Sequence, residues 1–357
     1  MRYEFLNVCN DVTKTVTKIP QSEYLTEGIY PIYDQGKDII GGYSNTDNGI
    51  ASEYPYIVFG DHTRVIKYIN NPCFIGADGV KLLKVVNNNF LPKYVYYSMI
   101  ANPVESQGYS RHFKLLKETY IKYVDIVNQR KIIEELDNIN NSILAKNYEL
   151  ETLDELIKSR FIEMFENKGF ELLPIKEFVD IKKISAKKKF NSDEAIKYID
   201  ISLIDNERNV IKGYTNYLMK DAPSRAQQCL KKNDILISTV RPNLKNIAIF
   251  KDDDLYYVGS SGFCILRAKN VNYDYLKYVV LDDKFTNAMA DLTTGASYPA
   301  IRDDDVLNYL MINAPIKLQN KFADFVQQID KSKFIVQKEI KDLQELLDKK
   351  MDEYFRQ

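Results

Sequence analysis

The chain of 357 residues has no tryptophan, only two histidines and only four cysteines. The cysteines (Cys9, Cys73, Cys229 and Cys264) are scattered, and no two of them form a C-x-x-C pair. This pattern is typical of reduced thiols in a cytoplasmic protein and indicates neither a disulfide framework nor a zinc site. Since no His, Cys or carboxylate cluster has ligand spacing, we predict no metal site.

Catalytic signatures are missing as well. The chain contains no G-x-S-x-G, Walker A or G-x-G-x-x-G motif. The Asn/Asp-Pro-Pro-aromatic signature of amino-methyltransferases is also absent, since Asn102-Pro103-Val104 lacks the second proline and the aromatic residue. We therefore expect no catalytic residue and no cofactor in this chain.

Long apolar segments are absent too. No apolar run approaches the ~20 residues that cross a bilayer, and the N-terminus lacks the apolar core of a signal peptide. With 45% hydrophobic and 28% charged residues, the composition indicates a soluble, cytoplasmic protein without a membrane partner. The length predicts two or more domains.

An internal repeat is the strongest feature that the sequence does contain. The segments QRKIIEELDNIN (129–140) and QNKFADFVQQID (319–330) match at an offset of 190 residues, which holds for nearly forty residues. Identical pairs include Gln129 with Gln319 and Phe165 with Phe355. Upstream, Tyr94-Val-Tyr-Tyr97 is echoed by Tyr275-Leu-Lys-Tyr278.

Each repeated segment has the 3.5-residue period of a coiled-coil helix. The first seam consists of Ile132, Leu136, Ile139, Ile143, Lys146, Leu150, Leu153, Ile157, Arg160 and Met164. The second consists of Phe322, Val326, Ile329, Lys333, Val336, Ile340, Leu343, Leu347, Lys350 and Tyr354. At ~1.5 Å per residue such a segment makes a rod of ~57 Å. The helices are expected to pair with each other or with partner helices; the alternative is two ordinary amphipathic helices on separate cores.

The chain is therefore predicted to alternate globules and long helices, with segments 1–128, 129–166, 167–317 and 318–357. Short β-branched and aromatic runs at 56–59, 64–69, 234–239, 246–250 and 256–267 predict strands, and 92–101 and 274–290 predict helices. The fold class is α+β: two mixed α/β globules with mainly antiparallel strands, separated by two long helices.

Charge is distributed unevenly over these segments, although the net charge is only −1. The first long helix carries 5 basic and 9 acidic residues, whereas 167–317 carries 23 basic and 20 acidic residues. Because nucleic-acid binding depends on local patches, a polyanion is expected to prefer the globules.

Four segments resemble the specificity subunit of Type I restriction–modification systems. They are FGDHTRVIKYINNPCFIGADGVKLL (59–83), YIDISLIDN (198–206), DAPSRAQQCLKKNDILISTVRPNL (221–244) and TTGASYPAIRDDDV (293–306). The resemblance covers essentially the whole chain. It implies that 1–128 and 167–317 are target-recognition domains, each reading one half of a split DNA target. It also implies that 129–166 and 318–357 form an antiparallel coiled coil that sets the gap.

The resemblance implies partners as well. They are double-stranded DNA, two modification (methyltransferase) subunits that carry S-adenosylmethionine, and restriction (endonuclease/translocase) subunits; the chain itself would be non-catalytic. One alternative is the recognition subunit of a related system that cuts on both sides of its site. Another is a coiled-coil interaction protein that sequesters modification subunits without reading DNA.

DNA recognition combines phosphate contacts, which position a protein, with base-edge contacts, which specify sequence. The candidate DNA contacts are His62, Arg64, Lys67, Lys81, Arg111 and Lys114 in the first globule, and Ser224, Arg225, Gln227, Arg241, Asn243, Lys245, Thr294, Ser297 and Tyr298 in the second. The lysine run 182–189 is either a phosphate-binding arm or solvated surface. Asp61-His62 could be a general acid/base pair, but Asp61 is expected to organise the turn or to orient a neighbouring side chain.

Overall fold

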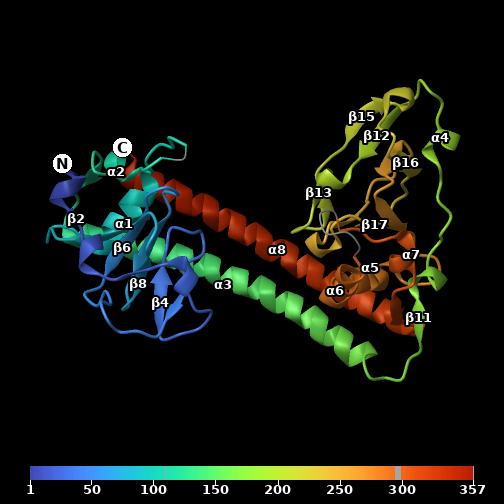
Figure 1. Ribbon diagram of the computed structural model, residues 1–357, viewed down its shortest axis with the longest axis horizontal. Coiled ribbons are helices and arrows are strands. Elements are labelled where there is room, and N and C mark those ends of the chain that lie inside the picture. Colours follow the sequence, from blue (N-terminus) through green and yellow to red (C-terminus); the bar gives the residue numbers. More distant parts are fainter. Residues whose placement is uncertain (109, 294–298, 357) are drawn as a thin grey trace. The chain divides into compact units, whose positions relative to one another are not determined.

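The computed structural model describes residues 1–108, 110–293 and 299–356, which form two compact units (Figure 1). Unit 1 comprises Met1–Leu150 and Ile335–Gln357, and unit 2 comprises Glu151–Phe334. Both units combine helices with small sheets, so the α+β class is confirmed. Each long helix contributes to both units, whereas the four-segment division gives each helix a segment of its own; that division stays a prediction.

Unit 1 is built on two four-stranded sheets, ordered β2-β9-β6-β7 and β3-β8-β4-β5, and on the separate pair β1-β10. Its strands are β1 (Arg2–Glu4), β2 (Cys9–Asp11), β3 (Lys18–Ile19), β4 (Tyr30–Tyr33), β5 (Gly42–Ser44), β6 (Tyr56–Gly60), β7 (Ile66–Ile69), β8 (Phe74–Gly76), β9 (Val80–Val85) and β10 (Tyr120–Lys122). Its short helices are α1 (Pro92–Ala101) and α2 (Phe113–Leu116).

Unit 2 contains sheets ordered β15-β12-β19-β16 and β18-β17-β20, and the pairs β11-β21 and β13-β14. Its strands are β11 (Leu172–Pro174), β12 (Ala195–Ile199), β13 (Ile204–Asp205), β14 (Val210–Ile211), β15 (Thr215–Leu218), β16 (Ala226–Cys229), β17 (Ile235–Ser238), β18 (Ile247–Ile249), β19 (Tyr257–Ser260), β20 (Phe263–Leu266) and β21 (Leu310–Ile312). Its shorter helices are α4 (Ala186–Lys189), α5 (Tyr273–Leu281), α6 (Asp283–Asp291) and α7 (Asp303–Leu307).

The helical stretch predicted at 274–290 is present but is divided into two helices, because α5 ends at Leu281 and α6 begins at Asp283. Asp282 between them has an extended backbone, with φ −67° and ψ 146°. Its carboxylate accepts the backbone N–H of Lys284 at 2.7 Å. An N-cap of this kind favours a helix start, and so the local hydrogen bond divides the segment.

The two units share one plan. In each, a buried central strand lies between two antiparallel neighbours: β6 between β7 and β9, and β17 between β18 and β20. A three-residue strand near the start of each unit pairs antiparallel with the strand that precedes a long helix, β1 with β10 and β11 with β21. The expectation of mainly antiparallel strands is confirmed; the parallel pairs are β3-β8, β4-β8 and β12-β19.

The long helices α3 (Ile126–Phe165) and α8 (Ile316–Phe355) have 40 residues each. Every residue of the two predicted seams is buried or half-buried, so the predicted period is confirmed. In unit 1 the Lys350 ammonium lies 3.0 Å from Glu135, and the Lys146 ammonium lies 2.8 Å from Glu339. As the α3 number rises, the α8 number falls, so the pair in this unit is antiparallel.

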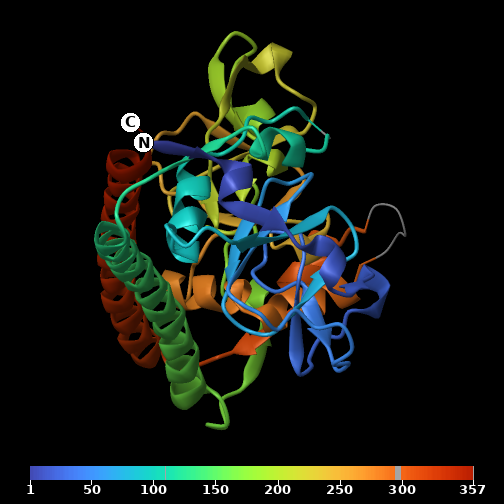
Figure 2. The ribbon, with the colours of Figure 1, turned by 90° about the vertical axis from the view of Figure 1, so that its left-hand side faces the viewer.

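The same order holds in unit 2. The Lys333 ammonium lies 2.6 Å from the Asp154 carboxylate, and the rings of Phe161 and Phe322 are 5.5 Å apart. Figure 2 shows α3 in green and α8 in red running side by side. The antiparallel pairing that the resemblance implied is thus observed in each unit.

Residues that are identical across the repeat have the same structural role. Gln129 and Gln319 are both buried. The Gln129 side-chain carbonyl accepts the N–H of Leu91 at 2.7 Å, just before α1, and that of Gln319 accepts the N–H of Asn272 at 2.9 Å, just before α5. Each glutamine therefore fixes the start of a globule helix against a long helix.

In each unit, the C-terminal end of one long helix packs against the core. The buried Tyr94 donates its hydroxyl to the Lys122 carbonyl and lies 5.1 Å from the ring of Phe355, at the end of α8. In unit 2 the buried Tyr275 lies 4.8 Å from Phe165, at the end of α3, and also donates its hydroxyl to a β21 carbonyl. The repeated tyrosines and phenylalanines thus form matching core contacts.

Candidate nucleic-acid interface

Three loops of unit 2 are joined by backbone hydrogen bonds. In the β19–β20 turn, the Ser261 N–H donates to the carbonyl of Arg225, in the loop before β16, at 2.8 Å. In the same turn, the Gly262 carbonyl accepts the N–H of Thr239, in the loop between β17 and β18, at 2.9 Å. Arg225 and Arg241, which are distant in sequence, therefore lie on loops fixed to one common turn.

Most of the predicted contacts of unit 2 are exposed. Ser224, Arg225, Gln227, Arg241 and Asn243 all have exposed side chains. The neighbouring glutamine, Gln228, is buried instead, and its amide group donates to the carbonyls of Ser260 and Phe263 at 3.0 and 2.8 Å. Thr294, Ser297 and Tyr298 lie outside the described residues.

Lys245 is half-buried and forms an ion pair with Asp283 at the start of α6. Two effects of Lys245 hold the pKa of the Asp283 carboxyl below its ordinary value. The larger is the hydrogen bond that its ammonium donates, and the smaller is the attraction of its positive charge. The ammonium therefore anchors its own loop. Its contact with DNA stays a prediction.

In unit 1 the segment FGDHTR forms the hairpin between β6 and β7. Asp61 is buried, its carboxylate accepts the Phe113 N–H at 2.7 Å, and its backbone carbonyl accepts the His112 N–H at 2.8 Å. His112 is buried too, and its Nε2 accepts the Gln107 N–H at 3.1 Å. The expectation that Asp61 organises a turn is confirmed: it joins the hairpin to the segment before α2.

Other predicted contacts in this hairpin region have partners inside unit 1. His62 Nδ1 lies 3.2 Å from the Ser110 carbonyl, and the Arg64 guanidinium donates to the Val104 carbonyl at 3.1 Å. Lys67 is only 7% exposed and lies 3.4 Å from Asp34. These contacts hold loops in place, and DNA contact by the three residues stays a prediction.

A basic cluster surrounds the ring of Phe113. The ammonium groups of Lys81 and Lys117 lie 4.8 and 5.5 Å from the ring centroid, within the range of cation–π attraction. Lys81 also lies 3.3 Å from Asp11. Arg111 and Lys114 beside it are exposed. Lys117 was missed in the sequence because no motif marked it, although it follows Lys114 by one helical turn.

The lysine run 182–189 includes α4 and has mixed surroundings. Lys183 forms an ion pair with Asp303, and Lys189 donates to the Leu255 carbonyl. Lys187 and Lys188 are exposed. Both interpretations of the run, a phosphate-binding arm or solvated surface, stay open.

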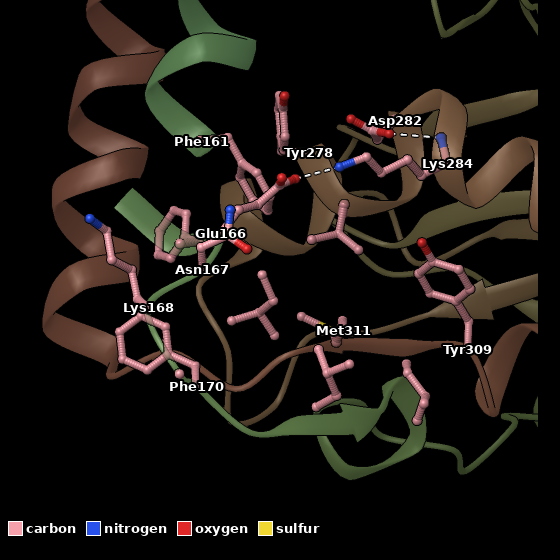
Figure 3. A pocket seen from close by; sticks show the side chains of 16 residues that line it. Phe161, Glu166, Asn167, Lys168, Phe170, Tyr278, Asp282, Lys284, Tyr309 and Met311 are labelled. Atoms are coloured by element: carbon pink, nitrogen blue, oxygen red, sulfur yellow. Dashed lines mark hydrogen bonds and ion pairs between the residues drawn. The ribbon is translucent and has the colours of Figure 1, made fainter. Parts of the chain in front are cut away.

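A cavity of about 500 Å³ lies in unit 2 where α3 ends (Figure 3). Aromatic side chains including Phe161, Phe165 and Tyr278 line it, and a Glu166–Lys284 ion pair lies at its edge. Burial raises the pKa of Tyr278, which keeps its hydroxyl protonated. Among the described residues that line the cavity, no nucleophile is paired with a base.

The four thiols are all buried. Burial raises the pKa of Cys9 and of Cys73 to about 12, which keeps both thiols protonated at neutral pH. Within the described ranges, no group of His, Cys, Asp or Glu side chains could hold a metal ion. Nor does any helix described here have the length and apolar character needed to cross a membrane.

The two units thus share one duplicated α+β plan, and in each the end of a long helix packs against the core. No protein-family model matches the chain. It is similar to the Type I restriction enzyme HindI specificity subunit of Haemophilus influenzae, with 29% identity over 41% of this chain and 32% of the relative. It is also similar to the MjaVIII specificity subunit of Methanocaldococcus jannaschii, with 24% identity over 61% of this chain and 56% of the relative.

The chain thus spans about a third and just over half of the lengths of these two relatives. The solved S subunit of a Type I restriction-modification system from M. genitalium matches 99% of this chain and 96% of its own, with a TM-score of 0.56 and 14% identity. That likeness shows the fold. Together the comparisons confirm the resemblance to Type I specificity subunits that the sequence motifs carried.

Proposed function

We propose that the chain is the DNA-reading specificity subunit of a Type I restriction–modification enzyme and is itself non-catalytic. The observation that supports this most is the duplicated plan with different loops. Several residues of the cores and helix anchors correspond between the units, as Tyr94 with Tyr275 and Gln129 with Gln319 do, whereas the loops after the central strands differ in length. Such a pair of units suits a target with two different half-sites.

The exposed candidates form the proposed DNA contact set. In unit 1 they are Arg111 and Lys114, with Lys117 beside them; in unit 2 they are Ser224, Arg225, Gln227, Arg241 and Asn243. The other described candidates are half-buried or buried, and their contacts within the chain support a positioning role; they are His62, Arg64, Lys67, Lys81 and Lys245.

The long helices are proposed to bind two modification subunits, which carry S-adenosylmethionine and the methylation chemistry, and to set the gap between the half-sites. Each helix exposes large apolar side chains outside its seam. In unit 1, Leu144 on α3 is 62% exposed and Ile335 on α8 is 57% exposed. Exposed apolar side chains on long helices suit docking by partner helices. Restriction subunits are expected to join the assembled complex.

Methylome sequencing of cells that express the chain with its own modification subunit tests this proposal. A bipartite adenine-methylation motif with an unread gap is expected. R225A in unit 2 and R111A with K114A in unit 1 should each weaken the recognition of one half-site only. If each change degrades both halves equally, the assignment of one unit to one half is wrong.

The spacing role has its own test. Lengthening α3 and α8 together by one heptad should change the unread gap and leave both half-sites intact, because the seam positions stay in register. An unchanged gap in a complex that still methylates would show that the helices do not set it. Equal binding of all DNA sequences by the purified complex would instead favour a partner-sequestering protein.

A further inference from the structure

The turn between β17 and β18 has an unusual backbone. Arg241 has φ 50° and ψ 60°, and Lys245 has φ 50° and ψ 37°, so both are left-handed. They flank the 3-10 turn Pro242–Leu244. A left-handed conformation is strained for any residue other than glycine, so two within five residues require support from their surroundings.

The surroundings supply that support from three directions. The Arg241 N–H donates to the Pro299 carbonyl at 2.8 Å, and the Asn206 side chain donates to the Leu244 carbonyl at 2.8 Å. The Lys245 ammonium is held by Asp283 of α6. Within the turn, the Leu244 N–H donates to the Arg241 carbonyl at 3.0 Å. The backbone of the turn is therefore fixed before any ligand binds.

The turn presents three side chains to the outside. Pro242 is buried, whereas Arg241, Asn243 and Leu244 are exposed, and Leu244 is 43% exposed. A planar guanidinium pairs with the O6 and N7 atoms of guanine, and a primary amide pairs with N6 and N7 of adenine. An apolar side chain contacts the thymine methyl group. Leu244 was not among the sequence candidates, although it ends the motif DILISTVRPNL.

The composition of the turn favours bases over phosphates. Phosphate-binding surfaces depend on several cations. Here the second cation of the turn, Lys245, is already paired with Asp283. What the turn exposes is one arginine, one amide and one apolar side chain, a set that matches base edges in the major groove. A rigid backbone also lowers the entropy lost when these side chains bind.

We propose that residues 241–244 are a preformed base-reading turn, with Arg241 on a guanine, Asn243 on an adenine and Leu244 on a thymine methyl group. This inference rests on the proposed function and adds to it how unit 2 reads its half-site. It predicts that this half-site contains a G·C pair and neighbouring A·T pairs.

The test is methylome sequencing of the assembled complex with the variants R241K, N243A and L244A. R241K keeps the charge and loses the guanidinium fork, so discrimination at a single G·C position should fall about tenfold or more. N243A and L244A should each relax one A·T position. The matched control is K269Q, which removes an exposed charge of unit 2 from the segment after β20.

The outcomes are distinguishable. Relaxation of single positions in one half-site supports the proposal. Unchanged motifs in all three variants, or uniformly weaker methylation with no relaxed position, overturn it and leave the proposed function standing. If the wild-type complex yields no bipartite motif, the proposed function fails first. N243A and L244A lie outside the left-handed positions, so they still test the turn if R241K fails to fold.

Discussion

The hairpin that follows the central strand differs between the two units. In unit 1 the β6–β7 loop is short and its side chains turn towards neighbouring loops: Asp61 binds the Phe113 N–H and Arg64 binds the Val104 carbonyl. In unit 2 the β17–β18 loop is longer, and Arg241 and Asn243 are exposed. Arg64 of the first loop is half-buried and donates to a carbonyl of its own unit, whereas Arg241 and Asn243 of the second loop are exposed.

Under the proposed function, two units of one plan with different loops would read two different half-sites. Both loops contain a left-handed arginine, Arg64 with φ 63° and Arg241 with φ 50°. This backbone feature is present in both loops although the loops differ in length. In unit 1 the exposed cations lie elsewhere, around Phe113.

The largest expected effect tests whether the matching phenylalanine–tyrosine core contacts stabilise the two units equally. F355A in unit 1 and F165A in unit 2 each remove a buried ring that packs on a buried tyrosine, Tyr94 or Tyr275. Each should destabilise its own unit by about 3–5 kcal/mol. Hydrogen–deuterium exchange of the core strands β6 and β17 measures the units separately. If only one of the two variants loses stability, the two core contacts are not equivalent.

The loop anchors should differ in strength. D61A removes a buried carboxylate that accepts a backbone N–H, and should lower the local stability of unit 1 by about 1.5–3 kcal/mol. T239A removes a hydroxyl that donates to the Gly262 carbonyl at 3.0 Å, and should cost about 0.5–1.5 kcal/mol. Exchange of the amides near each loop checks both values. D61N, which keeps an acceptor oxygen, is the control and should fall between wild type and D61A.

The left-handed arginines should respond alike, despite their different side-chain partners. Replacement by glycine should leave the protein about 1 kcal/mol more stable than replacement by alanine, at position 64 and at position 241, because alanine keeps the backbone strain. Thermal unfolding of R64G, R64A, R241G and R241A provides the measurement. Equal stability of glycine and alanine at either position would contradict the strained geometry there.

The smallest effect concerns the ion pair between Lys245 and Asp283. Because the native pKa of Asp283 is lowered, the pair contributes stability above the ordinary carboxyl pKa and loses it as the pH falls through the native value. The side chains are partly exposed, so the contribution should stay below about 1 kcal/mol. D283N should loosen the turn at neutral pH and remove this acid dependence, as amide exchange at Leu244 and Lys245 can show.

Local periodicity and the repeat made the positions of the long helices and of α1 predictable. The seam from Ile132 to Met164 is buried or half-buried throughout, and the helix predicted at 92–101 is α1. The break at Asp282 was missed because the apolar pattern continues across it, while a single cap bond decides where one helix ends. The sequence indicated candidate contacts only by residue type, and their contact with DNA stays a prediction. The set included Arg241 and Asn243, and the sequence did not distinguish them from the buried Lys67.

The sequence by itself determined the duplicated α+β plan, the two long helices and the resemblance to Type I specificity subunits, because periodicity and motifs are local properties of the chain. Only the tertiary structure decided which side chains of the hairpin loops are exposed. Exposure depends on contacts between distant segments, such as Arg241 with Pro299 and Asp61 with Phe113. The same residue type, an arginine in the loop after a buried strand, is therefore half-buried in one unit, as Arg64 is, and exposed in the other, as Arg241 is.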